Sequence, residues 1–302
     1  MNFQIFMKTI NIISLSIVGI VLIYSFGWYI YSPLSRPEIR DYEEASNYIR
    51  GRFDKTRDVI DLQPFWAERA REYLGDLNII NPRDISKEDL NKYRNIFVFS
   101  VFDYGKQVLP FFKQRFKFVE EKTFGKIRVY QFENPTPEDV LYSFYDNLKD
   151  AKIRVIKGSE IKECKEFKND QWRCGGPDWQ YIGKEILDID GTGRECLWSH
   201  PITGAIIEIN FENVPLSRKI AGFSGLTDEA VRYVEGSPVY LSISIDDKEV
   251  LYHTNPNKIG AHRFEIDTTP FRGSNHKVTF RVSTHLDGVR HYCFTAEVRD
   301  SR

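Results

Sequence analysis

The sequence predicts an α+β multidomain chain with a single N-terminal transmembrane helix, a small three-layer α/β domain and a C-terminal antiparallel β-sandwich of the jelly-roll type. Three observations carry this prediction. A long stretch near the start has no charge, the next hundred residues alternate helical with strand-like patterns, and the remainder is one amphipathic strand after another. We expect the three parts at residues 1–35, 36–136 and 137–302.

The uncharged stretch covers residues 9–35, and its apolar centre, residues 10–31, is long enough to cross a bilayer as one helix. A cleavable signal peptide is the alternative, but its apolar region usually has only about 7–15 residues and ends in small residues. Here the stretch ends in Tyr and Trp side chains, which favour the headgroup level of a bilayer. The sequence therefore predicts a retained membrane anchor.

The segment after the anchor alternates helical and strand-like patterns. Helices are expected at 41–52, 63–74, 86–93 and 106–116, and strands at 58–62, 77–80, 95–100, 118–122 and 127–132. Alternating strands and helices indicate a mostly parallel sheet, and the last two strands form a hairpin at its antiparallel edge. We therefore expect helices on both faces of a small sheet.

From about residue 138 the pattern changes to strands alone. Strands are expected at 140–145, 152–156, 179–186, 205–211, 239–245, 262–266, 277–282 and 291–298. Most of them alternate apolar with polar residues, as half-buried antiparallel strands do. The sequence predicts a β-sandwich of about eight or more strands.

All four cysteines lie in the second half of the chain. Cys164 and Cys174 bound a short hairpin-like loop that can bring two sulfurs within bonding range. Cys196 and Cys293 lie in the opening and closing strands of the β-domain, which often pair. We therefore predict the disulfides Cys164–Cys174 and Cys196–Cys293, with four buried free thiols as the alternative. Disulfides favour an oxidising location, so with the anchor the sequence predicts a single-pass protein of a bacterial inner membrane with periplasmic domains.

Composition and motif spacing exclude several functions. A net charge of -1 provides no basic field for nucleic acid. The six histidines have no metal-ligand spacing, and residues 188–193 only echo the start of a calcium loop, so a hairpin turn is the better reading. No nucleophile, acid or base can be assigned. We expect a non-catalytic protein without metal or cofactor.

Three stretches of the first soluble part carry a resemblance: residues 58–66, the strand at 93–99 and the segment 124–130. Together they resemble the soluble extracytoplasmic domain of polytopic glycosyltransferases of the protein-mannosyltransferase and aminoarabinose-transferase kind. Catalysis in that family belongs to a multi-span domain, and this chain has one predicted span. The resemblance therefore implies a borrowed recognition or docking domain. No Gly-rich phosphate fingerprint follows a strand here, so a nucleotide is not expected.

The order of features in the last hundred residues resembles the galactose-binding-like jelly rolls found in carbohydrate-binding modules. The matching pieces are residues 211–215, 220–228, 239–246, 248–250, 264–268 and 278–282. In that family, ligand contacts usually come from loops at one end of the sandwich. The resemblance implies this architecture and, with it, a glycan as ligand.

Candidate ligand contacts lie beside the second predicted disulfide, which would bring two segments together. Trp198 and His200 follow Cys196, and Arg290 and His291 precede the partner cysteine. An aromatic ring beside Arg and His can hold a sugar, because the ring offers an apolar face and the polar groups fix hydroxyls. The alternative is that Trp198 belongs to the core and His200 caps a turn.

Two functions remain open from the sequence. The first is a membrane-anchored extracytoplasmic protein whose β-sandwich binds a glycan or another cell-envelope ligand. The second is an accessory or structural subunit of a larger membrane protein complex. Trp172 and Trp179, which flank the first predicted disulfide loop, are either exposed or packed beneath it. An exposed aromatic cleft would favour the first function, and a broad, flat apolar patch the second.

Overall fold

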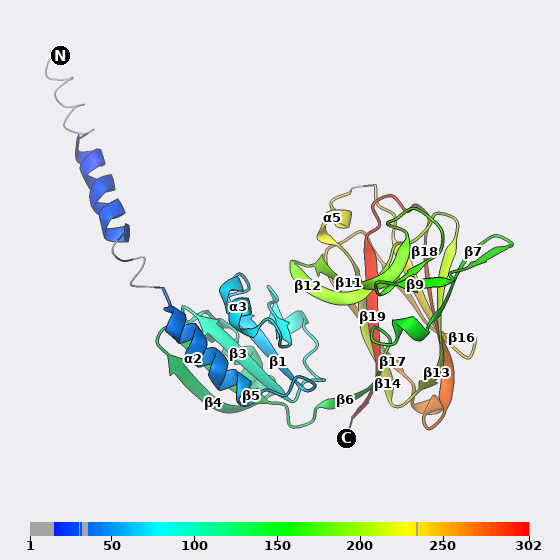
Figure 1. Cartoon of the computed structure of the whole chain (residues 1–302), viewed down its shortest axis with the longest axis horizontal. Helices are drawn as coiled ribbons and strands as arrows, with labels where there is room; N and C mark the ends of the chain where they lie inside the picture. Colours follow the sequence, from blue (N-terminus) through cyan, green and yellow to red (C-terminus); the bar gives the residue numbers. More distant parts are fainter. Residues whose placement is uncertain (1–14, 30, 32–35, 234, 302) are drawn as a thin grey trace, which may run out of the picture.

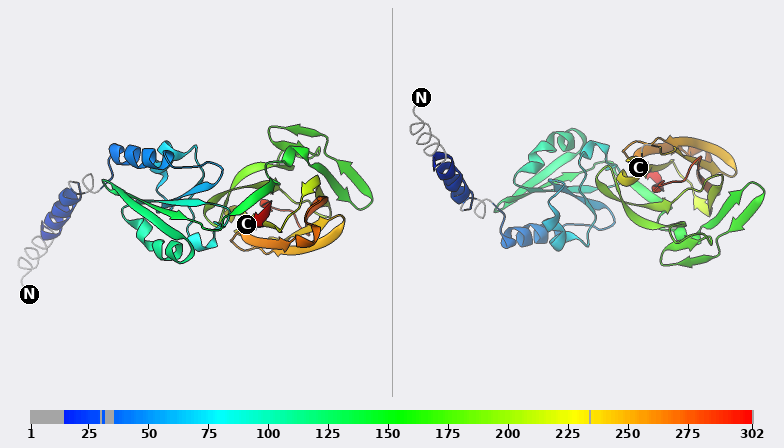
Figure 2. Two further views of the ribbon diagram at one scale, coloured as in Figure 1. Left: turned by 90° about the horizontal axis from the view of Figure 1, so that it is seen from below. Right: turned by 90° about the horizontal axis from the view of Figure 1, so that it is seen from above.

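The computed structural model describes residues 15–29, 31, 36–233 and 235–301 (Figure 1). Within these residues 45% are in strands and 21% in helices. One sheet belongs to an N-terminal unit, residues 36–137, and two larger sheets form a sandwich from residue 138 onward. The two bodies lie one after the other along the molecule (Figures 1 and 2). The predicted domain boundary at residues 136–137 stays a prediction.

The predicted fold class is wrong, because strands dominate the described residues and the predicted transmembrane helix is not found among them. Residues 15–29 are helical, while residues 10–14 and 30 of the predicted span lie outside the described residues. No helix in the described ranges combines the length and the apolar character needed to cross a bilayer. The predicted single-pass location in a bacterial inner membrane is overturned by the same finding.

Two of the four helices predicted for the α/β domain are replaced by shorter elements. Segment 86–93 contributes only η2 (Ile85–Lys87), and segment 63–74 contributes η1 (Glu68–Ala70) and the four-residue α3 (Arg71–Leu74). Their apolar side chains are spaced for a helix, but they pack onto the sheet from short turns. Helical periodicity therefore overestimated the helical content of this unit.

The described part of the N-terminal unit contains a five-stranded sheet in the order β2-β1-β3-β5-β4. Strand β1 (Asp58–Gln63) lies between β2 (Ile79–Ile80) and β3 (Asn95–Val101) and is parallel to both. Strand β5 (Ile127–Glu133) runs antiparallel to β3 and pairs with β4 (Lys117–Phe124). The predicted hairpin at the antiparallel edge is thus confirmed.

Short helices cover both faces of this sheet (Figure 2). Helix α2 (Ile39–Arg50), η1 and α3 pack on one face against Ile60 and Phe97. On the other face, η2 and α4 (Leu109–Arg115) pack against Val59 and Val98. Neighbouring residues of one strand enter different clusters because side chains alternate between the faces of a strand.

Two antiparallel sheets form the sandwich, and this part of the prediction is confirmed. The first sheet has the order β17 (His262–Asp267), β14 (Lys219–Leu226), β19 (Tyr292–Ser301), β12 (Thr192–Ser199), β11 (Tyr181–Ile189), β10 (Gln171–Arg173), β9 (Glu166–Lys168), with β6 (Glu138–Ser143) beside β19. The second has the order β16 (Lys248–Asn255), β15 (Val239–Ile245), β18 (Asn275–Thr284), β13 (Ile206–Pro215), β7 (Lys152–Lys157), β8 (Glu160–Glu163). One apolar cluster, which includes Phe144, Phe211, Phe280 and Phe294, fills the space between them.

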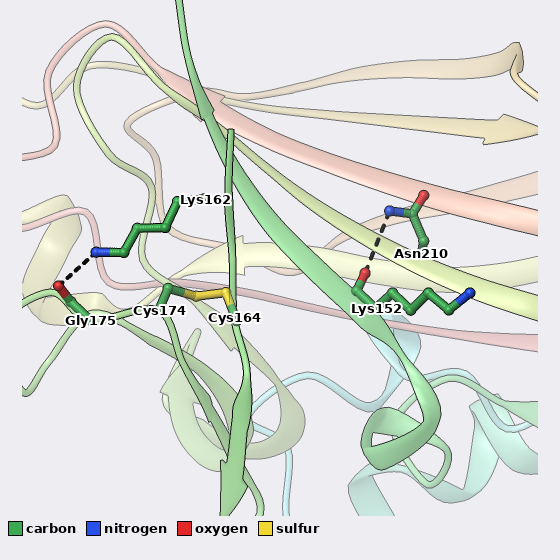
Figure 3. Close-up of a disulfide and its surroundings, with 6 residues drawn as sticks. All are labelled: Lys152, Lys162, Cys164, Cys174, Gly175 and Asn210. Carbon is green, nitrogen blue, oxygen red and sulfur yellow. Dashed lines mark hydrogen bonds between the residues drawn. A yellow bond between two sulfur atoms is a disulfide. The ribbon is translucent and has the colours of Figure 1, made fainter. Parts of the chain in front are cut away.

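The four cysteines pair as the sequence predicts. Cys164–Cys174, drawn in Figure 3, joins the end of β8 in one sheet to the end of β10 in the other and so links the two sheets. Beside it, Lys162 Nζ donates a hydrogen bond to the Gly175 carbonyl at 3.0 Å (Figure 3). The second disulfide, between residues 196 and 293, joins β12 to β19 within the first sheet.

Buried ion pairs connect the N-terminal unit to the first sheet of the sandwich. Arg194 on β12 forms two hydrogen bonds with the Glu88 carboxylate, at 2.8 and 2.5 Å, and both side chains are more than nine-tenths buried. Lys92 contacts Glu297 on β19 at 2.7 Å, and the same carboxylate receives Arg299 at 2.6 Å. Charges removed from water in this way are stable only while each is paired.

Candidate ligand-binding site

Aromatic side chains from three segments of the first sheet gather at the end of the sandwich. Tyr181 begins β11, with Trp179 two residues before it; Trp198 lies near the end of β12, with His200 two residues on; His291 immediately precedes β19. We call these five residues the aromatic–histidine cluster. Their spacing by two places them on the outer face of the sheet, while Leu197 and Phe294 point into the core.

Ring contacts run through the whole cluster. The Trp179 and His200 rings have centroids 4.5 Å apart, and Tyr181 stacks on Trp198 at 5.9 Å with planes 29° apart. His291 lies 5.5 Å from Trp198 and 6.0 Å from His200. Trp198 Nε1 also donates a hydrogen bond to the Trp179 carbonyl at 3.2 Å. Offset and tilted ring pairs at these separations are mutually stabilising.

Burial divides the cluster into a supporting layer and an exposed layer. Trp198 is only 8% exposed and His200 only 6%, whereas Trp179 is 46% exposed. Tyr181 and His291 are partly exposed. The rings available to a ligand are therefore Trp179, Tyr181 and His291, and the two buried rings hold them in place.

Burial decides the protonation of two members of the cluster, His200 and Tyr181. Burial lowers the pKa of His200, partly offset by its hydrogen bond to the Pro201 carbonyl, so the ring is neutral at pH 7. Burial and the hydrogen bond from its hydroxyl to Glu185, at 2.7 Å, raise the pKa of Tyr181, which stays protonated. The Arg173 guanidinium lies over the Tyr181 ring, 4.9 Å from its centre.

The structure brings together the rings of three of the four predicted ligand residues, Trp198, His200 and His291. The fourth, Arg290, makes different contacts. Its side chain is fully buried. It donates to the Ala230 carbonyl at 2.7 Å, to Asn257 Oδ1 at 2.8 Å and to the Ser237 carbonyl at 3.3 Å. Arg290 therefore holds neighbouring loops, and its charge is not presented to a ligand.

Sequence reasoning missed Tyr181 and the polar groups next to it. Tyr181 and Glu185 lie on the same face of β11 as Trp198 on β12, because Gly183 between them pairs with Trp198. Alternation within residues 181–185 could have shown that Tyr181 and Glu185 share a face. The register between β11 and β12 decides which ring each one meets, and the sequence alone does not give it.

In the parts of the chain that the structure describes, no group of three or more His, Cys, Asp or Glu side chains is arranged to hold a metal ion. The hairpin turn at 188–193 includes Asp190 and Gly191, both with positive φ. Asp190 instead pairs with Lys87 of the N-terminal unit at 2.8 Å. This segment thus connects the two bodies.

No family model and no curated protein matches the chain. Among solved structures, similar chains include the second CBM51 and INT domains of Clostridium perfringens ZmpB in complex with GlcNAc (13% identity, 54% of this chain and 40% of that chain, TM-score 0.31). Another is the CBM51 of Clostridium perfringens GH95 in complex with methyl-galactose (12% identity, 49% of this chain and 92% of that chain, TM-score 0.29). A third is the mannan-recognising module TmCBM27 (9% identity, 62% of this chain and 98% of that chain, TM-score 0.28).

These neighbours are carbohydrate-binding modules, and this chain spans less than half the length of the first of them. The expected resemblance of residues 36–136 to a glycosyltransferase domain receives no support from any comparison. Identity and TM-score are low throughout. The function proposed below therefore rests on the geometry of the site.

Proposed function

We propose that this protein is a non-catalytic glycan-binding protein that holds a sugar on the aromatic–histidine cluster. The observation that carries the proposal is the exposed Trp179 ring, supported from beneath by the buried His200 ring and held by a hydrogen bond from Trp198 to its backbone. A large aromatic surface exposed at a loop costs free energy in water, and stacking on the apolar face of a sugar ring recovers part of it.

Polar groups beside the rings match the hydroxyls of a sugar. Glu185 offers a carboxylate on the same face, and Arg173 offers guanidinium N–H groups above Tyr181. His291 adds a ring nitrogen, 3.6 Å from the Glu229 carboxylate. Apolar ring faces with a few convergent polar groups are typical of small-molecule sites, in which the polar groups decide orientation and specificity.

The site is largely organised before a ligand arrives. The disulfide between residues 196 and 293 holds β12 against β19, and thus Trp198 against His291. Side chains that are already fixed lose little conformational freedom on binding, so more of the contact energy appears as affinity. His200 and Tyr181 are neutral and already hydrogen-bonded, which suits recognition without chemistry.

A glycan array followed by calorimetry tests the proposal with the full chain. Trp179→Ala is expected to weaken binding of the array-selected glycan about tenfold or more, the effect of losing one well-packed aromatic contact. Tyr252→Ala is the matched control, because Tyr252 is a 60% exposed aromatic residue on the other sheet. Equal affinity of the Trp179 variant and the control would refute the proposal.

A further inference from the structure

The N-terminal sheet contains a topological switch point that the proposed function does not use. The connection from β1 to β2 packs Ala70 and Leu74 on one face of the sheet. The connection from β2 to β3 packs Ile85 and Leu90 on the other face. The connection after β3 also packs on that second face, through Phe112 of α4, so the chain leaves the neighbouring parallel strands β1 and β3 toward opposite faces of the sheet. Ligands of parallel sheets bind at such points, outside the carboxyl ends of the strands.

Four aromatic residues occupy this point. Phe65 and Trp66 follow the end of β1, and Phe102 and Tyr104 follow the end of β3. We call them the switch-point cluster. The Trp66 ring lies 6.5 Å from Phe102 and 5.6 Å from Tyr104, the latter edge-on at 77°, so the two loops converge. All four rings are exposed, and Trp66 is the most exposed at 51%.

The loop after β3 is fixed in an uncommon conformation that keeps its rings outside. Phe102 and Asp103 both have left-handed φ angles, of 53° and 62°. Ser100 Oγ accepts a hydrogen bond from the Gly105 N–H at 2.8 Å, and a Cβ at that glycine would lie 2.6 Å from the Ser100 Cβ. Asp103 is further held by Lys106 at 2.8 Å. Left-handed residues other than glycine occur preferentially at functional sites.

Charged side chains around the switch-point cluster are paired with one another: Arg71 contacts Glu68 at 2.7 Å, and Lys106 and Arg128 both contact Asp103 at 2.8 Å. Arg83 lies over the Phe65 ring at 5.5 Å, and Lys106 borders the other loop. Glu68, which accepts a hydrogen bond from Asn81 at 2.9 Å, and Asp103 supply two carboxylates. No Gly-rich segment follows β1 or β3 that could hold a phosphate. Paired charges and exposed ring faces match a neutral ligand better than a nucleotide or a cation.

We propose that the switch-point cluster is a second binding site, which takes a neutral saccharide by stacking on Trp66. This site lies on different strands and loops from the aromatic–histidine cluster. A failure of glycan binding at that cluster would therefore not disprove binding at the switch-point cluster. A chain with two such sites binds a polymer more tightly than a short sugar, because the second contact forms within one complex.

The test is fluorine NMR of the full chain labelled with 5-fluorotryptophan, which reports each of the five Trp residues separately. Resonances are assigned with single Trp→Phe variants. The probes are methyl-galactoside, N-acetylglucosamine, mannohexaose and xylohexaose, added one at a time. We expect at least one probe to shift the Trp66 resonance in a saturable way, with Trp66→Ala weakening its binding about tenfold.

Two variants separate the two sites. Trp179→Ala should leave the Trp66 titration unchanged, and Trp66→Phe, which keeps an aromatic face and the fold, should retain most of the affinity. The proposal is overturned when no probe moves the Trp66 resonance, whatever happens at Trp179. A second result would also overturn it. If a probe shifts the Trp66 resonance of Trp179→Ala at full amplitude, but Trp66→Ala binds that probe with unchanged affinity in calorimetry, then Trp66 does not contact the sugar.

Discussion

Asp61 should make this protein less stable as the pH rises. It lies in the middle of β1 and is fully buried between two neighbouring strands. Its carboxylate receives hydrogen bonds from Gln63 Nε2 at 3.1 and 3.2 Å. Burial raises the pKa of Asp61 to about 7, partly opposed by Gln63 and reinforced by the nearby Glu88. The folded protein therefore keeps this proton to a pH far above that at which the unfolded chain releases it.

The difference between the pKa values of Asp61 in the folded and unfolded chain decides how folding stability changes with pH. The contribution of Asp61 to stability is fully present below pH 3.8, the ordinary pKa, and is lost progressively as the pH rises to about 7. The two pKa values differ by about 3, and each unit is worth about 1.4 kcal/mol, so the loss is about 4 kcal/mol. Asp61→Asn keeps an acceptor for Gln63 and removes the titration.

Urea unfolding at pH 4, 5, 6, 7 and 8, followed by tryptophan fluorescence, measures the effect. The free energy of unfolding of Asp61→Asn minus that of the wild type should grow by up to about 4 kcal/mol between pH 4 and 8. Asp76→Asn is the control, since Arg50 and Lys55 lower the pKa of this exposed carboxyl. A difference for Asp61→Asn that stays constant across this range would refute the reasoning.

Three further results are expected. Glu88→Gln should lower the free energy of unfolding by about 3–5 kcal/mol, because it leaves the buried Arg194 without its partner; Glu88→Gln with Arg194→Met should recover part of this loss in the same urea assay. Replacing Cys196 and Cys293 by Ala should cost about 5 kcal/mol, against about 3 for the disulfide that closes ten residues, in line with sequence separations of 97 and 10. Removing the disulfide between residues 196 and 293 should also weaken glycan binding, because it holds Trp198 against His291. Equal losses of stability and of glycan affinity on removing either disulfide would contradict this role.

The strands and cysteine pairs of the sandwich were predictable because the signals are local. Alternation marks a strand within a few residues, and the pairing of the cysteines follows from their spacing along the chain and from the strands that open and close the sandwich. The same local signal misled at 86–93, where Leu90 has the spacing of a helix but packs from an irregular segment. The strand β14 was missed because Gly222 and Gly225 interrupt its pattern. Glycine removes the side chain on which the alternation depends.

The site itself needed information between strands. Trp198 was identified from its neighbours in the chain, yet its contacts come from another segment, where Tyr181 stacks on its ring and the Trp179 carbonyl accepts its N–H. Arg290 was predicted as a ligand contact because charge predicts exposure, whereas in the structure four backbone and side-chain oxygens surround it. Only long-range pairing brings those oxygens together, so no local pattern distinguishes a ligand contact from a structural arginine.

Asp61 and the contact between the two bodies of the molecule should be energetically coupled. Glu88 raises the pKa of Asp61, and the same carboxylate binds Arg194 of the sandwich. In Glu88→Gln the negative charge disappears and Arg194 loses its neutralising partner, so both changes favour an ionised Asp61. Asp61→Asn should stabilise the protein more at pH 8 than at pH 4, and this increase should be smaller in the Glu88→Gln background than in the wild type. Equal growth in both backgrounds would show that the ion pair and the buried carboxyl act independently.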